Sequence, residues 1–458
     1  MKRRSRQSPN RPPRVSLISL GCPKNQVDSE NLLGALADAG VVLCPDPADA
    51  DIVIVNTCGF ILPARDECRQ LLGELIERKR RPGSPLRRIA IVGCWVERER
   101  NNLPAEFSEV DRWVGLLTPE RMAALAEWVG GGSVAAKEQG SSHVPLWYEG
   151  DRPRIGLPHV AYLRISDGCI NRCSYCTIPS IRGPLRSKLI ETILAEGQEF
   201  ARQGAQELIL VGQDLANFGR DRGGKSELPQ LVAQLDREID VPWIRLMYLH
   251  PAHVNEELLV ELARSRRLVH YLDVPLQHIS DRLLAAMNRR VTRGEIEALI
   301  QRLRQIWPDL VLRTTFIVGF PGETEAEFEE LLSFVRRTGF ARMGAFQYYA
   351  EADTRAADMP QQVPQPVRAE RLARLMQAQQ EISLAQNRAL VGRVIESIVD
   401  FRGEDPGTWI GRTYGDAPDV DGTILFSSPH GRLTDGRIVQ ARVTDASAYD
   451  LSGSVDSA

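Results

Sequence analysis

Three cysteines, Cys169, Cys173 and Cys176, stand close together in the polar run Ser-Asp-Gly-Cys-Ile-Asn-Arg-Cys-Ser-Tyr-Cys. Three thiolates can bind three irons of a 4Fe–4S cluster and leave the fourth iron open to an outside ligand, whereas electron-transfer clusters normally use four cysteines. A structural zinc site closes with four ligands, and the next histidine after this run is only His250. The spacing therefore favours a cluster with an open iron. The alternative, three buried core cysteines, fits poorly in a loop that contains glycine.

Three further cysteines each follow a short apolar run, in Leu20-Gly21-Cys22, Asn56-Thr57-Cys58 and Val92-Gly93-Cys94. These runs are rich in β-branched residues and short enough to be buried strands of a parallel sheet. Ligands of open α/β sheets gather at the carboxyl ends of the strands. We therefore expect Cys22, Cys58 and Cys94 to converge, although three small buried residues remain the alternative. Cys44 and Cys68 do not follow a strand, and we expect them to be ordinary core residues.

The first segment of the chain alternates between strands and helices, which indicates an open α/β domain. The predicted strands are Val15–Leu20, Asp51–Val55 and Arg88–Val92, and the predicted helices are Asp28–Ala39 and Arg65–Arg78. Residues 130–155 are rich in Gly, Ser and Pro, which indicates a linker.

From Ala161 the alternation resumes with six strand–helix units. The predicted strands are Tyr162–Ile165, Glu207–Val211, Trp243–Tyr248, Tyr271–Val274, Leu310–Val318 and Met343–Tyr349. The predicted helices are Ser187–Gln203, Asn255–Ser265, Arg293–Trp307 and Thr324–Thr338, and the last begins with a capping-box pattern. Six units are fewer than the eight of a closed barrel, so we expect a partial barrel with its site at the carboxyl ends of the strands.

A long amphipathic helix, Pro366–Leu390, leads into residues 391–452, which alternate like short strands joined by turns. We expect a small β-barrel of a kind often used for nucleic acids. The segment from Arg393 to Asp450 nevertheless carries six basic and ten acidic residues. A barrel that grips RNA should be positive, whereas an acidic barrel suits a basic protein partner. A merely solvated acidic surface is the alternative interpretation.

The run from Gly219 to Ser226 matches the phosphate-loop pattern GxxxxGKS letter for letter. Such a loop works because it joins a strand directly to a helix and aims backbone N–H groups at the phosphates. Here the preceding strand ends near Val211, and Pro229 places the next helix start after Ser226. We therefore expect a charged surface loop, and a P-loop NTPase is kept only as a distant alternative.

The composition, 43% apolar and 26% charged residues in a chain of 458, is that of an ordinary soluble protein of two to four domains. The first 14 residues carry six basic groups and no acid, which indicates a disordered tail, with RNA contact as the alternative. No apolar stretch approaches the ~20 residues of a membrane span, and none near the start is long enough for a secretory signal. We expect a cytoplasmic protein whose eight cysteines serve metal binding or catalysis rather than disulfides.

The C-x3-C-x2-C spacing, with Tyr175 before the last cysteine, resembles that of radical S-adenosylmethionine (SAM) enzymes. Across about residues 14–452 the chain resembles the methylthiotransferases of that superfamily, and within them the branch that modifies ribosomal protein S-twelve. The matching runs begin at Leu20 (LGCPKNQVDSE), Asn56 (NTCGF), Val274 (VPLQH), Thr315 (TFIVGFPGET) and Gly411 (GRTYGDAP). Cys-Pro-Lys-Asn and Asp-Ala-Pro point to the ribosomal-protein branch, because tRNA-modifying members resemble Cys-Gln-Met-Asn at the first site. One departure is Ser452, where the family usually has Trp.

The resemblance implies an α/β fold in three parts: an N-terminal open α/β domain, a central partial (βα)6 TIM-like radical SAM barrel, and a C-terminal small β-barrel of the TRAM type. We expect a basic tail at 1–13, the N-terminal domain at 14–129, a linker at 130–154, the radical SAM core at 155–387 and the TRAM domain at 388–456.

The resemblance also implies two 4Fe–4S clusters, one on Cys169, Cys173 and Cys176 and the other on Cys22, Cys58 and Cys94. The first would bind SAM and, after reduction, yield a 5′-deoxyadenosyl radical that takes hydrogen from the β-carbon of an aspartate in ribosomal protein S-twelve. The second would supply sulfur, and a second SAM the methyl group. We expect SAM contacts from Tyr175, Gly212, Gln213, Asp214, Gln277, Arg313, Gly319 and Glu323, each of which also fits a purely structural role. His278 has no clear metal role.

The expected partners are ribosomal protein S-twelve, free or in the small subunit, and a low-potential electron donor such as flavodoxin or ferredoxin. We expect a monomer with no membrane partner and only secondary RNA contact. A tRNA adenosine methylthiotransferase shares every cluster residue and remains the main alternative, and a non-catalytic iron–sulfur carrier is a further one.

Overall fold

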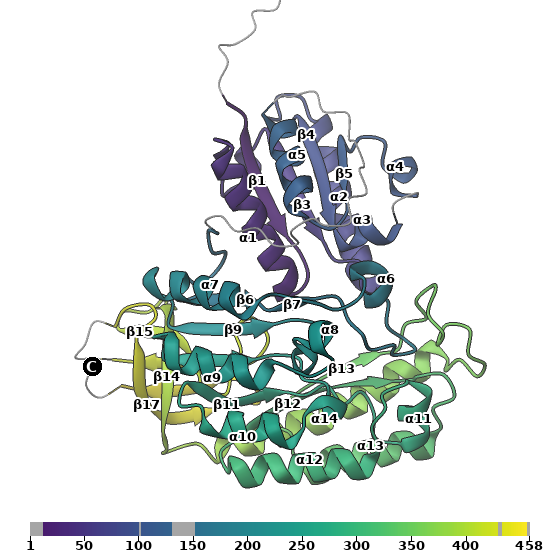
Figure 1. The fold of residues 1–458 in the computed structure, drawn as a ribbon, viewed down its shortest axis with the longest axis vertical. Coiled ribbons are helices and arrows are strands. Elements are labelled where there is room, and N and C mark those ends of the chain that lie inside the picture. The colour runs from purple at the N-terminus through teal and green to yellow at the C-terminus, as the bar shows by residue number, and fades with distance from the viewer. Residues whose placement is uncertain (1–11, 100–101, 131–151, 429–432, 456–458) are drawn as a thin grey trace, which may run out of the picture. The chain divides into compact units, whose positions relative to one another are not determined.

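A computed structural model of the chain describes residues 12–99, 102–130, 152–428 and 433–455 (Figure 1). They form two compact units: an N-terminal unit up to Ile155 that also includes Ser180–Arg182, and a C-terminal unit made of the rest. Most of the predicted basic tail at 1–13, and residues 131–151 of the predicted linker, lie outside the described residues.

The N-terminal unit is built on a parallel sheet in the order β2-β1-β3-β4-β5. Helices α1 and α5 cover one face of this sheet, and α2 and α3 cover the other. Each pair of helices packs its apolar residues into a separate buried cluster with the strands. The open α/β domain is thus confirmed, and β2 and β5 extend it beyond the three predicted strands. The strands are β1 (Arg14–Ser19), β2 (Val42–Leu43), β3 (Ile52–Thr57), β4 (Arg88–Gly93) and β5 (Arg112–Val114), and the helices are α1 (Pro23–Asp38), α2 (Leu62–Arg80), α3 (Cys94–Glu99), α4 (Leu103–Glu106) and α5 (Pro119–Val129).

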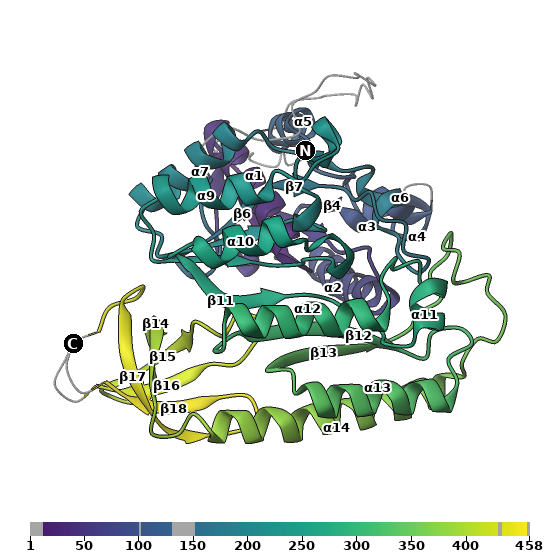
Figure 2. The same cartoon turned by 60° about the horizontal axis from the view of Figure 1, so that its bottom comes forward.

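The C-terminal unit contains a six-stranded parallel sheet in the order β13-β12-β11-β10-β9-β6 (Figure 2). This confirms the partial barrel of six strands. The strands are β6 (Val160–Arg164), β9 (Glu207–Val211), β10 (Trp243–Leu246), β11 (Leu268–Asp273), β12 (Val311–Val318) and β13 (Arg342–Gln347). The helices between them are α7 (Ile190–Arg202), α9 (Leu228–Glu238), α10 (Glu256–Arg264), α11 (Asp281–Ala286), α12 (Arg293–Ile306) and α13 (Glu325–Thr338).

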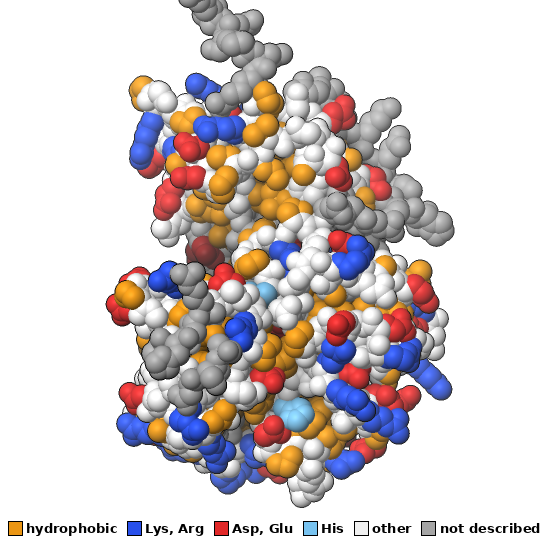
Figure 3. Space-filling view, turned by 90° about the vertical axis from the view of Figure 1, so that its left-hand side faces the viewer, with side chains coloured by type: hydrophobic (Ala, Val, Ile, Leu, Met, Phe, Trp, Pro, Cys, Tyr) orange, Lys and Arg blue, Asp and Glu red, His pale blue; other side chains and the backbone are white. Residues whose placement is uncertain are grey.

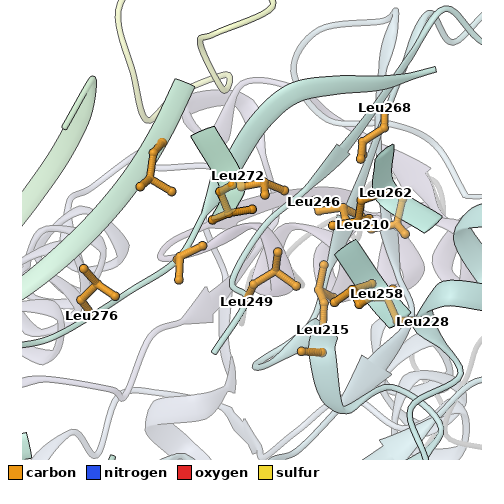
Figure 4. Packing of buried hydrophobic residues seen from close by; sticks show 14 of the residues in the cluster. Leu210, Leu215, Leu228, Leu246, Leu249, Leu258, Leu262, Leu268, Leu272 and Leu276 are labelled. Carbon is orange, nitrogen blue, oxygen red and sulfur yellow. The ribbon is translucent and has the colours of Figure 1, made fainter. Parts of the chain in front are cut away.

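One apolar core joins these helices to the strands. Leucines from β9, β10 and β11 interlock with leucines from α9 and α10, and all of those labelled in Figure 4 are almost fully buried. Burial of a leucine side chain contributes about 1.5–3 kcal/mol, so this core fixes the strand register on which the site depends. The capping box predicted at the start of α13 is present, with Thr324 and Glu327 bonded to each other's backbone N–H groups.

The long helix α14 (Gln365–Arg388) leads into a closed barrel of five strands in the order β14-β15-β16-β18-β17. The predicted small barrel is therefore confirmed. Its strands are β14 (Val394–Arg402), β15 (Thr408–Thr413), β16 (Ile424–Ser427), β17 (Ile438–Ala446) and β18 (Leu451–Ser454).

The barrel packs against the amino-terminal ends of the parallel strands. Arg342, at the start of β13, forms an ion pair with Asp416 at 2.6 Å, and Trp243, at the start of β10, donates to Glu396 at 2.8 Å. The carboxyl ends of the strands, where the Cys169 loop begins, are thus at the other end of the sheet.

No helix in the described parts of the chain combines the length and the apolar character that crossing a membrane requires.

Candidate functional site

Cys22, Cys58 and Cys94 follow three neighbouring strands of the N-terminal sheet. Cys22 comes after β1 and caps the N-terminus of α1, Cys58 directly follows β3, and Cys94 follows β4 as the first residue of α3. Because β1, β3 and β4 are adjacent and parallel, their carboxyl ends meet at one edge of the sheet. The predicted convergence of these residues is therefore confirmed.

Glycines allow this edge to pack closely. A Cβ atom added at Gly21, which has φ +94°, would lie 2.8 Å from the Cβ of Cys58. A Cβ atom added at Gly59 would lie 2.6 Å from the carbonyl oxygen of Cys94. Both distances are too short for real side chains, so each glycine is required for the loops that carry two of the cysteines to touch.

The three thiols differ in their electrostatic surroundings. Burial raises the pKa of Cys58 to about 11 and that of Cys94 to about 12. For Cys22 burial acts in the same direction, but the charges of Lys24 and Arg182 outweigh it, and its pKa is lowered. Iron binding by Cys58 and Cys94 must therefore release their protons.

Two side chains beside Cys94 escaped the sequence analysis. Asn25 donates to the carbonyl oxygens of Leu20 and Thr57, which ties together the ends of β1 and β3, and its Oδ1 accepts from the Cys94 thiol at 3.5 Å. Arg182, which groups with this unit, lies 3.2 Å from Cys94 Sγ. Asn25 belongs to the Cys-Pro-Lys-Asn run, so the motif gave a signal for it, whereas nothing in the sequence pointed to Arg182.

Cys68 lies closer to this group than we expected. It is buried on α2, and its thiol is 3.6 Å from the carbonyl oxygen of Cys58. Its apolar neighbours in the core nevertheless agree with the expectation of an ordinary core residue. For Cys44 the expectation of a core residue is wrong, because this side chain is only half-buried and its thiol bonds the carbonyl oxygen of Asp46 at 3.2 Å.

Cys169, Cys173 and Cys176 lie in a loop after β6 that is closed at its base. The short strands β7 (Ser166–Asp167) and β8 (Arg186–Ser187) pair with each other, and Cys169 N–H donates to Gly183 O at 3.2 Å. The thiols influence one another electrostatically, which places them together. Burial raises the pKa of Cys169 to about 11 and that of Cys176 to about 12.

Asp214 supports this loop. One of its oxygens accepts from Asn171 at 2.8 Å and lies 2.8 Å from Nδ1 of His253. Burial would raise the pKa of Asp214, but the His253 hydrogen bond and the nearby His250 dominate and lower it. With its oxygens already bonded, Asp214 is placed to position the cysteine loop, and the contact with SAM that we expected stays a prediction.

Buried polar atoms without a protein partner lie near the carboxyl ends of the strands of the six-stranded sheet, where the cysteine loop begins. Ser166 Oγ, Gln213 Oε1 and Gln277 Oε1 find no hydrogen-bond partner among the described residues. Gly212 adjoins them, since a Cβ atom there would lie 2.7 Å from Ser166 Oγ. Gln277 has φ +74°, a strained conformation for a residue other than glycine. Buried polar groups without partners are costly, so these atoms fit a polar ligand such as SAM; the sequence analysis missed Ser166.

Two other expected SAM contacts already have protein partners. Arg313 pairs with Asp273 at 3.1 Å and with Asp421 of the small barrel at 3.4 Å, so its charge is neutralised there. Glu323 is fully buried and accepts from Arg371 at 2.8 Å and from Gly319 N–H. These bonds show that both side chains hold the structure that surrounds the site, and their contact with SAM stays a prediction.

The last two residues that we expected to contact SAM are Tyr175 and Gly319. Tyr175 packs against a small apolar cluster that includes Phe320 and Tyr348, beside the cysteine loop. Gly319 has φ +73°, and a Cβ atom there would collide with Arg368, which explains the glycine without any ligand.

The described residues contain no group of three or more His, Cys, Asp and Glu side chains arranged around a single metal ion. Thiolates of a 4Fe–4S cluster bind different irons and so stand farther apart than the ligands of one ion.

The rejected phosphate-loop match is not at a strand–helix junction. Between β9 and Gly219 lies a short turn of 3-10 helix (Leu215–Asn217), and the following helix α8 (Arg220–Gly223) is a single turn. The next long helix, α9, begins only at Leu228, after the whole match. The expected surface loop is confirmed.

Three family models match the chain. They are the Radical SAM superfamily over residues 163–335, the Uncharacterized protein family UPF0004 over 14–115 and the TRAM domain over 391–455. Together with the fold, these matches define the class: a radical SAM enzyme with an additional N-terminal domain and a terminal TRAM barrel.

Curated relatives cover nearly the whole chain. The ribosomal protein uS12 methylthiotransferase RimO of Syntrophotalea carbinolica is 43% identical over 446 residues, which is 96% of each protein. The proteins of the same name from Anaeromyxobacter sp. (strain K) and Pelotomaculum thermopropionicum are each 42% identical, covering 96% of this chain and 93% and 98% of theirs. The chain belongs to the RimO family of radical SAM methylthiotransferases.

A solved structure shares the fold at greater distance. The radical S-adenosylmethionine methyltransferase TsrM from Kitasatospora setae, with tryptophan substrate and a SAM analog bound, aligns with a TM-score of 0.52 and covers 72% of both chains. At 17% identity this likeness speaks for the fold alone.

Proposed function

We propose that the chain methylthiolates the β-carbon of an aspartate in ribosomal protein uS12, the S-twelve protein of the small subunit. The observation that carries this proposal is the presence of two separate groups of three cysteines, one in the loop that follows β6 and β7 and the other at the carboxyl ends of β1, β3 and β4. One open cluster suffices to make a radical, and the second is available to deliver another group, here sulfur. The names of the curated relatives supply the substrate.

In this proposal Cys169, Cys173 and Cys176 hold the radical SAM 4Fe–4S cluster, and Cys22, Cys58 and Cys94 hold the second one. When bound, the clusters and two molecules of SAM supply a carbon radical, the sulfur and the methyl group. The chain's own contribution is to leave one iron of each cluster without a protein ligand. Lowering of the Cys22 pKa by Lys24 and Arg182 favours the thiolate that iron binds.

SAM is bound, in this proposal, along the edge formed by Ser166, Gly212, Gln213 and Gln277. Three of these residues offer buried polar oxygens without partners, and the fourth leaves room because it lacks a side chain. Tyr175 closes the apolar side of the loop. Asp214 and Glu323 act indirectly, because they fix Asn171 and the Gly319 turn respectively.

The charge of the small barrel supports a protein substrate less strongly than its composition indicates. Asp400, Asp416 and Asp421 are almost fully buried and paired with arginines, so they do not contribute to the surface. Acidic and basic side chains both appear on the face shown in Figure 3, and basic side chains gather along its lower left edge. In this proposal RNA is only a secondary contact, because the segment from Arg393 to Asp450 carries more acidic than basic residues.

The working context follows from the proposed reaction. A low-potential donor such as flavodoxin or ferredoxin reduces the enzyme, which acts as a monomer in the cytoplasm, where ribosomes are made. In this proposal the domain boundaries are those expected from the sequence, with the radical SAM core at 155–387 and the TRAM domain at 388–456.

Anaerobic reconstitution with SAM, reductant and purified uS12 tests the proposal. The wild-type chain should form 5′-deoxyadenosine and methylthio-aspartate in uS12. Cys173→Ala should form neither product, whereas Cys58→Ala should keep 5′-deoxyadenosine formation and lose the methylthio group. Cys44→Ala, at a cysteine outside both groups, is the matched control and should behave as wild type. Methylthio-adenosine in tRNA with unmodified uS12 would contradict the substrate assignment.

A further inference from the structure

The last residue of α11 and the two residues after it bind the middle of the cysteine loop. This short segment, Ala286, Met287 and Asn288, forms three hydrogen bonds with the loop. The bonds run from Ser174 N–H to Met287 O (3.0 Å), from Ser174 Oγ to Ala286 O (2.8 Å) and from Asn288 Nδ2 to Arg172 O (2.6 Å). The residues on both sides of Cys173 are thus fixed to a single short segment that lies more than a hundred positions away in the sequence.

The same segment is strained around Arg289. Both of its neighbours, Asn288 and Arg290, have positive φ values, +57° and +52°. Left-handed conformations of residues other than glycine cost about 1–3 kcal/mol each and persist only where the surroundings demand them. Here two such residues set the direction of the side chain between them.

Arg289 points at the loop and is buried there. One guanidinium N–H donates to Cys173 Sγ with an N···S distance of 3.6 Å, and another donates to the carbonyl oxygen of Pro275. The residue is only 5% exposed, and it forms no ion pair with a carboxylate among the described residues. Its Nε also lacks a partner. A buried cation is costly unless negative charge lies nearby. The Asp214 carboxylate acts on Arg289 without an ion pair, and Cys173 accepts a hydrogen bond from the guanidinium, so the site favours negative charge at Cys173.

We propose that Arg289 is a positioning residue for the cysteine loop that also raises the reduction potential of the iron–sulfur centre held by Cys173. A hydrogen bond from a cation to a ligating sulfur stabilises the form of the centre with more negative charge, which is the reduced form. Reduction adds an electron beside this cation, so removing the cation makes reduction harder. The inference rests on the proposed function, since it needs a cluster at these cysteines.

The test is a redox titration of the full-length protein with both centres loaded, monitored by electron paramagnetic resonance. The relevant centre is the one whose reduced-state signal changes on addition of SAM. Arg289→Gln should lower its midpoint potential by about 59 mV, which corresponds to a tenfold change in the ratio of reduced to oxidised centre. Arg289→Lys keeps the positive charge but loses the planar set of guanidinium N–H donors. Its midpoint potential should therefore lie between those of Arg289→Gln and the wild type.

Arg290→Gln is the matched control, because it removes the same charge from the exposed neighbouring position. Its potential should equal that of the wild-type protein. If both Arg289 variants load the centre at the wild-type potential, the proposal is wrong. A wild-type potential combined with weakened equilibrium binding of SAM would also overturn it, and would assign Arg289 to the ligand's carboxylate instead.

The proposed function fails in a different way. A wild-type protein that shows no SAM-responsive centre would end both ideas before any arginine variant is made. If Arg289→Gln does not load iron, Arg289→Lys alone decides: a potential below that of the wild type supports the proposal, and an unchanged potential refutes it.

Discussion

His278 and Glu323 form a fully buried pair, with 3.1 Å between His278 Nε2 and a carboxylate oxygen of Glu323. His278 Nδ1 accepts from Ser280 N–H at 3.0 Å, so the ring proton is on Nε2 and is donated to Glu323. The second oxygen of Glu323 accepts from Arg371 on α14 and from Gly319 N–H. The pair therefore ties the loop after β11 and the turn after β12 to the long helix.

Glu323→Gln should destabilise the C-terminal unit by about 1–3 kcal/mol, because it removes the buried one of the two carboxylates that pair with Arg371 and the charged acceptor of the Gly319 N–H. The measurement is the free energy of unfolding from denaturant titration. Glu325→Gln is the control, since Glu325 also pairs with Arg371, at 3.1 Å, but its side chain is 55% exposed. We expect that change to cost at most about 1 kcal/mol. Equal losses in the two variants would contradict the anchoring role of Glu323.

Gly59→Ala should halve the iron content of the reconstituted protein and leave the SAM-responsive centre intact. The added Cβ would press on the backbone of Cys94 and Trp95 and separate the loops that carry Cys58 and Cys94. Gly73→Ala, in the middle of α2 with open space around it, is the control and should keep all the iron. It should also gain up to about 1 kcal/mol of helix stability. Full iron loading of Gly59→Ala would show that the cysteines need not approach so closely.

Arg412→Met should loosen the small barrel from the radical SAM core. Arg412 is buried and pairs with Asp400 of the barrel at 2.8 Å and with Glu207, at the start of β9, at 2.7 Å. Removing it leaves two buried carboxylates short of a partner, at a cost of about 3–5 kcal/mol. Limited proteolysis should then release a fragment near residue 388 faster than in the exposed control Arg402→Met. Identical cleavage rates would contradict the coupling of barrel and core.

Lys225→Ala should be silent. The residue lies on a surface loop between α8 and α9, away from any strand end, so no phosphate site depends on it. We expect unchanged methylthiolation of uS12 and a change in unfolding free energy within about 0.5 kcal/mol. A loss of activity in this variant, together with ATP binding by the wild type, would revive the nucleotide-binding interpretation.

Sequence reasoning located the cysteines because parallel topology forces strand ends together. Three strands of a parallel sheet, each followed by a cysteine, indicated that Cys22, Cys58 and Cys94 could converge at one edge, and the pairing of β3 with both β1 and β4 brings them there. The same reasoning could not find Arg289, whose contact with Cys173 joins positions far apart in the chain through a strained turn with no sequence pattern.

Charged residues were harder to interpret than cysteines. Glu323 and Asp214 follow strands, as ligand contacts do, whereas Arg313 lies near the start of β12, and all three are bonded to protein groups. The acidic residues of the small barrel looked like a surface, yet Asp416 and Asp421 pair with arginines of the core. Composition reports how many charges a segment has, and only the fold determines which of them meet a partner.

Iron analysis with Mössbauer spectroscopy on oxygen-free protein tests the central claim most directly. The wild-type chain should hold two 4Fe–4S centres. A triple Cys→Ala variant at positions 22, 58 and 94 should lose one centre, and a triple variant at 169, 173 and 176 should lose the other. A single centre in the wild-type protein, or zinc in place of iron, would contradict the account.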